Sequence, residues 1–152
     1  MKVSPGDVGG TPTGASNLTK GLKMSYDFPT ISLRARCVYV VDGDTVDLYV
    51  DTGFHSFRQE RFRLHGIDTP ELRDKDATKR ELAKDAKAAI SEALVTHAAT
   101  MGDWPLRIET FKDPDSFGRY IVRIFMNFDD NSGEVCINDW LVEQGHAVYR
   151  TY

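Results

Sequence analysis

Three short segments of this sequence gather carboxylates and arginines, the side chains that bind hard cations and phosphates in proteins. The first segment spans residues 41–46 and reads Val-Asp-Gly-Asp-Thr-Val. Asp-Gly is a common hairpin turn, and a turn by itself accounts for this segment. The functional interpretation is that Asp44, which stands where the next strand would begin, directs its carboxylate into a cleft.

The second segment spans residues 63–71 and reads Arg-Leu-His-Gly-Ile-Asp-Thr-Pro-Glu. Helix capping explains part of it, because Asp68 or Thr69 would cap a helical turn that continues with a proline and an acidic residue. Capping leaves Arg63 unexplained. We therefore regard Arg63 and Glu71, together with the two capping residues, as candidate site residues.

The third segment spans residues 113–120 and reads Asp-Pro-Asp-Ser-Phe-Gly-Arg-Tyr. Turn chemistry accounts for its proline and its glycine. Arg119 follows that glycine and enters a predicted strand. It is either a solvated cation at a strand end or a site residue.

Considered together, the three segments place two aspartates, one glutamate and two arginines on different loops of one small domain. Carboxylate and carbonyl oxygens are ligands for Ca²⁺ or Mg²⁺, and arginine binds phosphate through paired hydrogen bonds. Histidine and cysteine show no pair with the spacing of a zinc site. This combination predicts phosphodiester hydrolysis.

Hydrophobic periodicity predicts the elements that must position these loops. Strands are expected at residues 32–41, 46–50, 57–64, 106–111 and 120–125. Helices are expected from Thr78, in a capping box, to His97, and at residues 139–144 behind an Asn138 cap, and a turn is expected at residues 51–53. The order βββ-α-ββ-α fits a mainly β, α+β domain built on a five-stranded OB-fold barrel.

The composition excludes several classes of protein. The net charge of the 152 residues is −4, which argues against bulk positive charge as the means of holding nucleic acid or a membrane. No apolar run approaches the roughly 18 residues of a membrane span, and no export signal begins the chain, so a cytoplasmic location is the default expectation. Cys37 and Cys136 match no disulfide or metal pattern and are expected as buried free thiols.

Residues 1–30 are predicted to form a flexible arm or extension that precedes a domain over residues 31–152. The first 23 residues hold five glycines and two prolines but few large apolar side chains. Such a segment cannot bury enough surface to offset the entropy of ordering it.

In order and spacing, the segments resemble the staphylococcal nuclease (thermonuclease) family. The matching motifs are residues 41–46, residues 63–71 and residues 115–120, with a weaker fourth from Ile137 to Ala147. Together they extend over about residues 34–150.

The resemblance implies a Ca²⁺-dependent nuclease that cuts DNA and/or RNA, acts as an endonuclease and leaves 3′-phosphate ends; whether Mg²⁺ can replace Ca²⁺ stays open. It assigns one set of residues to the metal ion, namely Asp44, Asp68 and the main-chain oxygen of Thr69. It assigns a second set to catalysis: Glu71 for the attacking water, and Arg63 and Arg119 for the scissile phosphate.

The sequence departs from the family's pattern in two places. Ser116 and Phe117 stand where family members often carry a basic residue and a tyrosine, so anchoring of a terminal phosphate is expected to be weaker. The family's usual third, C-terminal helix is missing after Gly145, and a protein partner, self-association or the arm would cover that side. Tyr149 or Tyr152 would either stack on bases or pack the barrel end, and packing is the favoured interpretation. Ser116, Phe117 and Tyr149 are the candidate substrate-binding residues.

Two other functions stay open at this point. The barrel could bind nucleic acid or protein without cutting it, or it could be a structural component of a virion or another assembly. A pure binding module has no need of the acidic and arginine residues, and an acidic domain attracts a polyanion poorly without a metal ion. We therefore favour the nuclease.

Overall fold

The computed structural model describes residues 30–111, 115, 117–128 and 133–151. The chain divides into two units, residues 1–30 and residues 31–152, and nearly all described residues belong to the second. The predicted arm lies outside the described residues apart from Thr30, so it stays a prediction.

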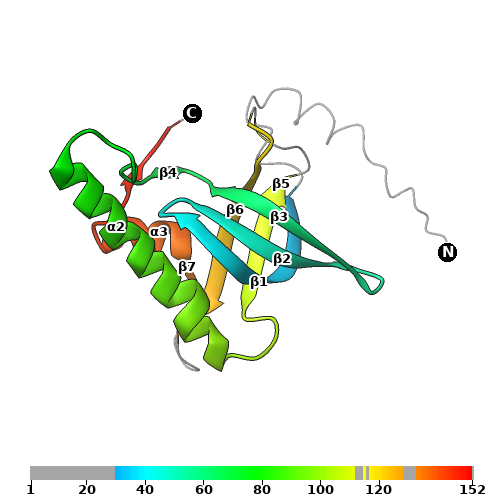
Figure 1. Cartoon of the computed structure of the whole chain (residues 1–152). Helices are drawn as coiled ribbons and strands as arrows, with labels where there is room; N and C mark the ends of the chain where they lie inside the picture. The colour runs from blue at the N-terminus through cyan, green and yellow to red at the C-terminus, as the bar shows by residue number, and fades with distance from the viewer. Residues whose placement is uncertain (1–29, 112–114, 116, 129–132, 152) are drawn as a thin grey trace. The chain divides into compact units, whose positions relative to one another are not determined.

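Five strands form a closed barrel (Figure 1). They are β1 (Thr30–Asp42), β2 (Thr45–Gly53), β3 (Ser56–Leu64), β5 (Leu106–Phe111) and β6 (Tyr120–Asn127). Neighbours follow the order β3-β2-β1-β5-β6, and a parallel pairing of β3 with β6 closes the ring. A short strand, β7 (Glu134–Cys136), pairs with Phe125, Met126 and Asn127 of β6, beyond the residues of β6 that pair with β3. The predicted OB-fold barrel of an α+β domain is confirmed.

Alternating apolar residues turn one face of each strand into the barrel. On β2, Val46, Leu48 and Val50 are buried, while most of the residues between and beyond them are partly exposed. Ile108 on β5 lies opposite Ile124 on β6, and both side chains are fully buried. Because side chains alternate along a strand, a register slip of one residue would turn the polar set inward, so this pattern fixes the register.

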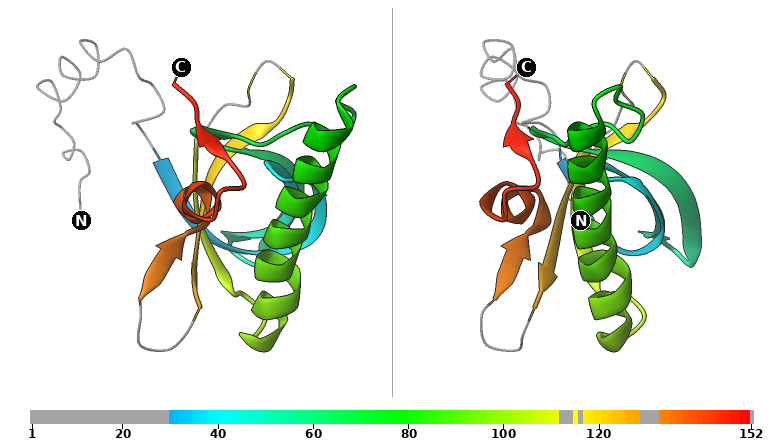
Figure 2. Two further views of the ribbon diagram at one scale, coloured as in Figure 1. Left: turned by 90° about the vertical axis from the view of Figure 1, so that its left-hand side faces the viewer. Right: turned by 60° about the vertical axis from the view of Figure 1, so that its left-hand side comes forward.

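The helix α2 (Ala77–Ser91) runs beside the barrel in both views of Figure 2 and continues as a π-helix, η3 (Glu92–His97), and a 3₁₀ turn, η4 (Ala98–Thr100). Its predicted place is confirmed, but two details are wrong. The first is the N-cap. The sequence predicts a start at Thr78 in a capping box, whereas the N-cap is Asp76, whose Oδ1 accepts a hydrogen bond from the Thr78 N–H at 2.9 Å.

The second detail concerns the apolar face of α2. The spacing of apolar residues in the sequence predicts Leu82 on that face, but Leu82 is 49% exposed, and the buried stripe is Ala83, Ala86 and Ile90. Two of the three buried residues are alanines. Small side chains let a helix approach its neighbour closely, so the helix lies against the barrel through alanine rather than through leucine.

The β2–β3 hairpin turns later than the sequence predicts. Gly53 pairs with Ser56, so the loop consists of Phe54 and His55, whose φ angles are 57° and 60°. A two-residue loop of this kind needs positive φ at both positions, which glycine and asparagine adopt most easily. The predicted turn at residues 51–53 is therefore wrong, because strand pairing continues through that segment.

The short helix α3 (Ile137–Glu143) is anchored by a buried side chain. The Asn138 Oδ1 accepts from the Ile124 N–H at 3.1 Å, and its Nδ2 donates to the carbonyls of His65 at 2.9 Å and Val122 at 3.1 Å. The predicted cap role of Asn138 is wrong, since the residue lies inside the helix. Its amide instead joins α3 to β6 and to the segment that follows β3.

A two-stranded ribbon ties that same segment to the end of the described chain. The strands are β4 (Ile67–Asp68) and β8 (Val148–Tyr149), which pair antiparallel. The Arg150 N–H also donates to the Gly66 carbonyl at 2.8 Å. The ribbon brings the residues after α3 next to the second sequence segment.

Other predicted features of the interior can be checked directly. Cys37 and Cys136 are free and half-buried, and burial raises the pKa of the Cys37 thiol to about 11. His97 is half-buried, and its Nε2 lies 3.0 Å from the Phe128 carbonyl oxygen. Trp140 packs against the core.

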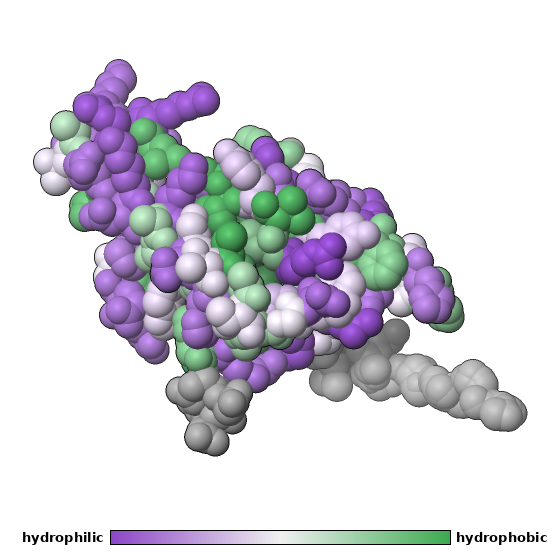
Figure 3. All heavy atoms as spheres, turned by 60° about the horizontal axis from the view of Figure 1, so that its bottom comes forward, coloured by the Kyte–Doolittle hydropathy of each residue, from purple (hydrophilic) through white to green (hydrophobic). Residues whose placement is uncertain are grey.

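Much of the surface drawn in Figure 3 is hydrophilic, with apolar side chains gathered in a green band between hydrophilic ones. Several large apolar side chains are exposed, among them Tyr39, Phe54 and Phe57. In the part of the chain that the structure describes, no helix has the length and apolar character needed to cross a bilayer.

The Asn138 contacts generate the first prediction. Asn138→Ala should lower the free energy of unfolding by about 2–4 kcal/mol, because it leaves buried backbone groups without partners. Urea unfolding measures the change. Asn127→Ala, which alters an exposed asparagine at the end of β6, should stay within about 0.5 kcal/mol of the unaltered protein. Equal losses in the two variants would contradict the anchoring role.

Candidate active site

A cleft with a volume of about 820 Å³ lies where several loops meet at the barrel. Its lining comes from the β1–β2 turn, the end of β3, the segment between β4 and α2, and the residues next to β6 and β8. All residues predicted for the metal ion and for catalysis line this one cleft: Asp44, Arg63, Asp68, Thr69, Glu71 and Arg119.

The β1–β2 turn approaches its neighbours closely because it contains Gly43. A Cβ at this position would lie 2.8 Å from the Thr69 Oγ1 and 2.9 Å from the Ala86 Cβ, closer than side-chain atoms pack. Asp44 follows this glycine, and the first residue of β2 pairs with Arg63 on β3. The close turn and the strand register thus set Asp44 beside Arg63.

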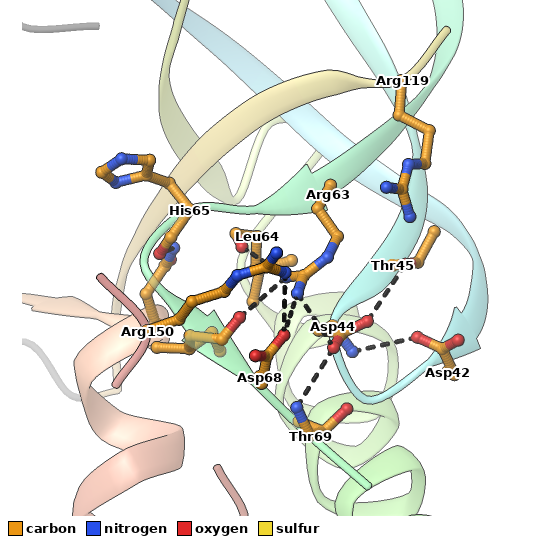
Figure 4. Close-up of polar contacts among 12 residues, drawn as sticks. Asp42, Asp44, Thr45, Arg63, Leu64, His65, Asp68, Thr69, Arg119 and Arg150 are labelled. Carbon is orange, nitrogen blue, oxygen red and sulfur yellow. Dashed lines mark hydrogen bonds and ion pairs between the residues drawn. The ribbon is translucent and has the colours of Figure 1, made fainter. Parts of the chain in front are cut away.

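The side chain of Arg63 is buried, and its guanidinium is held on several sides. Its Nη1 donates to the carbonyls of Leu64 at 2.7 Å and Ile67 at 2.9 Å. Its Nη2 donates to Asp68 Oδ1 and lies 3.5 Å from Asp44 Oδ2 (Figure 4). Burial of a charge is tolerated only with matched partners, so these contacts fix the orientation of the guanidinium.

Asp44 links the β1–β2 turn to two neighbouring segments. Its Oδ2 accepts from the Thr69 N–H at 3.1 Å, and its Oδ1 accepts from the Thr45 hydroxyl at 3.2 Å. Its main-chain carbonyl accepts from the Leu64 N–H at 2.8 Å. The carboxylate is therefore held in place by backbone and side-chain donors.

Asp42 adds a further carboxyl group to the cleft. Its Oδ1 accepts from the Asp44 N–H at 3.1 Å. Burial, together with the adjacent Asp44 carboxylate, raises the pKa of Asp42 to about 6. Two crowded carboxyl groups favour a cation beside them, because a cation offsets their repulsion.

Arg119 is positioned by Asp115. The Asp115 Oδ1 accepts from the Arg119 N–H at 2.9 Å, and its Oδ2 lies 3.1 Å from Nε and 2.9 Å from Nη2. Burial opposes ionisation of Asp115, but the donors of Arg119 and Phe117 outweigh it and lower the pKa of the carboxyl. In Figure 4 the Arg119 guanidinium points toward the space in which Arg63 lies.

Glu71 differs from the other acidic residues of the cleft because it is exposed. Its main-chain carbonyl accepts from the Asp74 N–H at 3.1 Å, which turns the chain toward α2. The carboxylate is accessible to water at the edge of the cleft. A carboxylate in that position can accept a proton from a water molecule.

Phe117 lies close to the cleft without lining it. Its ring is 80% exposed, and the Arg119 Cζ lies 5.1 Å from the ring centroid. Ser116 lies outside the described residues, so its predicted role stays a prediction.

Tyr149 is not among the residues that line the cleft. It is 62% exposed, and its hydroxyl donates to Asp139 Oδ1 at 3.1 Å. The favoured interpretation, that it packs the barrel end, is therefore wrong. Tyr152 lies outside the described residues.

Sequence reasoning missed three charged residues that line the cleft, namely Asp42, Arg73 and Arg150. Asp42 had a local signal, because it belongs to the same short motif as Asp44. Arg150 lies 3.3 Å from Asp68 Oδ1 and reaches it through the β4–β8 ribbon. No local pattern links two residues so far apart in the sequence.

The donor set of the cleft suits a hard cation. Asp44, Asp68 and the Thr69 carbonyl offer oxygen ligands, which Ca²⁺ and Mg²⁺ prefer. Among the described residues, no group of three or more His, Cys, Asp or Glu side chains is arranged to hold a metal ion. Two carboxylates and one carbonyl would leave several coordination positions of such an ion to water.

The contacts of Asp115 generate the second prediction. Asp115→Asn should lower the free energy of unfolding at pH 7 by about 0.5–1.5 kcal/mol, because a charge-assisted bond to Arg119 becomes a neutral one. The native pKa of Asp115 is depressed, so its contribution is present above the unfolded pKa and disappears as pH falls through the lower, native value. Urea unfolding at several pH values measures this convergence. A difference that grows toward acid would contradict the ion pair.

Comparison with known proteins adds an independent finding. The family described as staphylococcal nuclease homologue matches residues 61–152, which is more than half of the chain. No curated protein matches the chain. The matched range begins in β3 and includes Arg63, Asp68, Glu71 and Arg119, whereas Asp44 lies before it and reaches the same cleft through the β2–β3 pairing. The chain belongs to the staphylococcal nuclease family.

Proposed function

We propose that this protein is a metal-dependent nuclease that hydrolyses phosphodiester bonds of DNA, RNA or both. One observation carries the proposal: the buried guanidinium of Arg63 shares a cleft with a second arginine, Arg119, and with the exposed carboxylate of Glu71. Membership of a nuclease family supports the same conclusion.

The two arginines are proposed to stabilise the transition state. When water attacks phosphorus, the phosphate oxygens gain negative charge. Guanidinium donors directed at those oxygens therefore bind the transition state more tightly than the substrate. Arg63 is already oriented by its neighbours, so little reorganisation accompanies the reaction.

Glu71 is proposed as the general base. Its carboxylate would take the proton of the attacking water as the water oxygen bonds to phosphorus and the bond from phosphorus to the 5′ oxygen breaks, and the departing 5′ oxygen would take a proton from solvent water. The products would be a 3′-phosphate end and a 5′-hydroxyl end. Because Ser116 and Phe117 replace a basic residue and a tyrosine, recognition of a chain end is weak, and cutting within the chain is proposed.

Asp44, Asp68 and the main-chain oxygen of Thr69 are proposed to hold the metal ion, with Ca²⁺ favoured over Mg²⁺. A bound divalent cation would neutralise phosphate charge and orient water. With two carboxylates and one carbonyl from the protein, a dissociation constant of about 10⁻⁴–10⁻³ M is expected.

Phe117 is the proposed contact to a nucleobase. Its ring is exposed and lies against the Arg119 guanidinium, so a base stacked on it would lie close to the bound phosphate.

The third prediction concerns Glu71. Glu71→Gln should slow the cleavage of single-stranded DNA by about 10²–10⁴-fold, because the amide cannot accept the proton. The rate is measured under single-turnover conditions with excess protein. Glu81→Gln changes a glutamate of α2 with a 69% exposed side chain and should leave the rate unchanged. Full activity of Glu71→Gln would remove Glu71 from the mechanism.

The fourth prediction concerns the metal ion. EDTA should abolish cleavage, and added Ca²⁺ should restore it with half-maximal activity at about 10⁻⁴–10⁻³ M. A calcium titration of plasmid cleavage measures this. Cleavage that persists in EDTA would contradict metal dependence. Intact nucleic acid with a gel shift independent of calcium would instead indicate a binding module.

A further inference from the structure

A second cluster of side chains lies on the barrel outside the cleft. The rings of Tyr49 on β2, Phe57 on β3 and Trp104 before β5 lie together, with centroids 5.6, 5.7 and 6.1 Å apart. Their planes are nearly parallel, with interplanar angles of 13°, 9° and 8°.

Two arginines of β1 lie over these rings. The Arg36 Cζ is 4.6 Å from the Tyr49 centroid and 5.2 Å from the Trp104 centroid, and the Arg34 Cζ is 5.0 Å from the Trp104 centroid. We call this set the aromatic–arginine face: Arg34, Arg36, Tyr49, Phe57 and Trp104.

The packing of the barrel does not account for this face. Arg36 and Tyr49 form a cross-strand pair on the opposite side of the strands from the buried Ala35 and Leu48. Phe57 is 42% exposed. Large aromatic rings on the outer face of a strand contribute nothing to the hydrophobic core. A group of such rings therefore indicates a binding surface.

The charges on the face point to an anion. Arg34 is paired with Asp51 at 2.6 Å, whereas Arg36 makes no ion pair with any residue that the structure describes. Stacking over a ring leaves the N–H edges of a guanidinium directed outward. Those edges match phosphate, while the rings match nucleobases. The side chains of an apolar peptide would offer no acceptor to the guanidinium.

Strand β2 contributes residues to both the cleft and the face, with the Asp47–Arg61 ion pair between them. The first residue of β2 pairs with Arg63 in the cleft, and Tyr49 lies farther along β2. At about 3.3 Å per residue, the backbone positions are separated by about 13 Å. Figure 1 shows β2 and β3 leading from the barrel into a hairpin on the side away from α2.

We propose that the aromatic–arginine face binds single-stranded nucleic acid, as a second contact for a strand whose scissile phosphate lies in the cleft. The idea rests on the proposed nuclease function and extends it to a preference for single strands, whose unpaired bases alone can stack on the rings. In an acidic domain, a local cation set among rings supplies attraction that bulk charge does not.

The test measures binding separately from cleavage. Fluorescence anisotropy of a labelled oligothymidylate of about 12 nucleotides, within the range that one OB-fold covers, is recorded in EDTA. Arg36→Gln should raise the dissociation constant on the order of 10-fold. The control is Arg58→Gln. Arg58 is an exposed arginine of β3 that pairs with Glu60, and its substitution should leave binding unchanged.

Tryptophan fluorescence gives a second readout that does not depend on a variant that alters charge. Stacking of a base on Trp104 should quench its emission on titration with the oligonucleotide. In Trp104→Phe the quench should be lost, since the remaining tryptophan, Trp140, packs against the core. Thermal unfolding confirms that each variant is folded.

The outcomes separate this inference from the proposed function. The proposed binding role of the aromatic–arginine face is supported, even if no nucleic acid is cut, when Arg36→Gln binds more weakly, Arg58→Gln does not, and the oligonucleotide quenches the unaltered protein. Equal binding by the unaltered protein, Arg36→Gln and Arg58→Gln overturns it, even if cleavage is observed. Absence of any binding by the unaltered protein also overturns it.

Discussion

Burial of the Arg63 guanidinium is the constraint on which the rest of the site depends. A charge removed from water must be matched by acceptors, and here these are two carboxylates and two carbonyls. The acceptors come from the β1–β2 turn, from the end of β3 and from β4. Satisfying one side chain therefore brings together loops that are distant in the sequence, and it places Asp44 and Asp68 side by side.

Other contacts hold those loops at the required distance. Gly43 allows the β1–β2 turn to touch Thr69 and α2, and the buried amide of Asn138 ties the carbonyl of His65 to α3 and β6. The β4–β8 ribbon holds the same segment from its other side. The site is thus built on the barrel and its flanking helices. Contacts within the protein fix the orientation of the guanidinium groups of Arg63 and Arg119. Such preorganisation is what stabilisation of a developing phosphate charge requires.

Local patterns carried much of the prediction from sequence. Strand alternation revealed the five barrel strands, and three sequence motifs revealed six of the residues that line the cleft. The predictions that were wrong or missing concern residues whose positions depend on tertiary contacts. Leu82 has the right period but faces solvent, because small alanines suit the close approach of α2 to the barrel. Asn138 looks like a cap but serves three buried backbone groups, and Arg150 reaches Asp68 only through strand pairing.

The central claim is that the guanidinium of Arg63 acts on a phosphodiester. It is tested most directly by single-turnover cleavage of an end-labelled DNA strand in excess Ca²⁺ by the unaltered protein and by Arg63→Lys. Lysine keeps the charge but cannot reproduce the planar array of donors. We expect cleavage by the unaltered protein and a loss of about 10²–10³-fold in the variant, with thermal unfolding showing that the variant is folded. Equal rates, or no cleavage by the unaltered protein, would contradict the account.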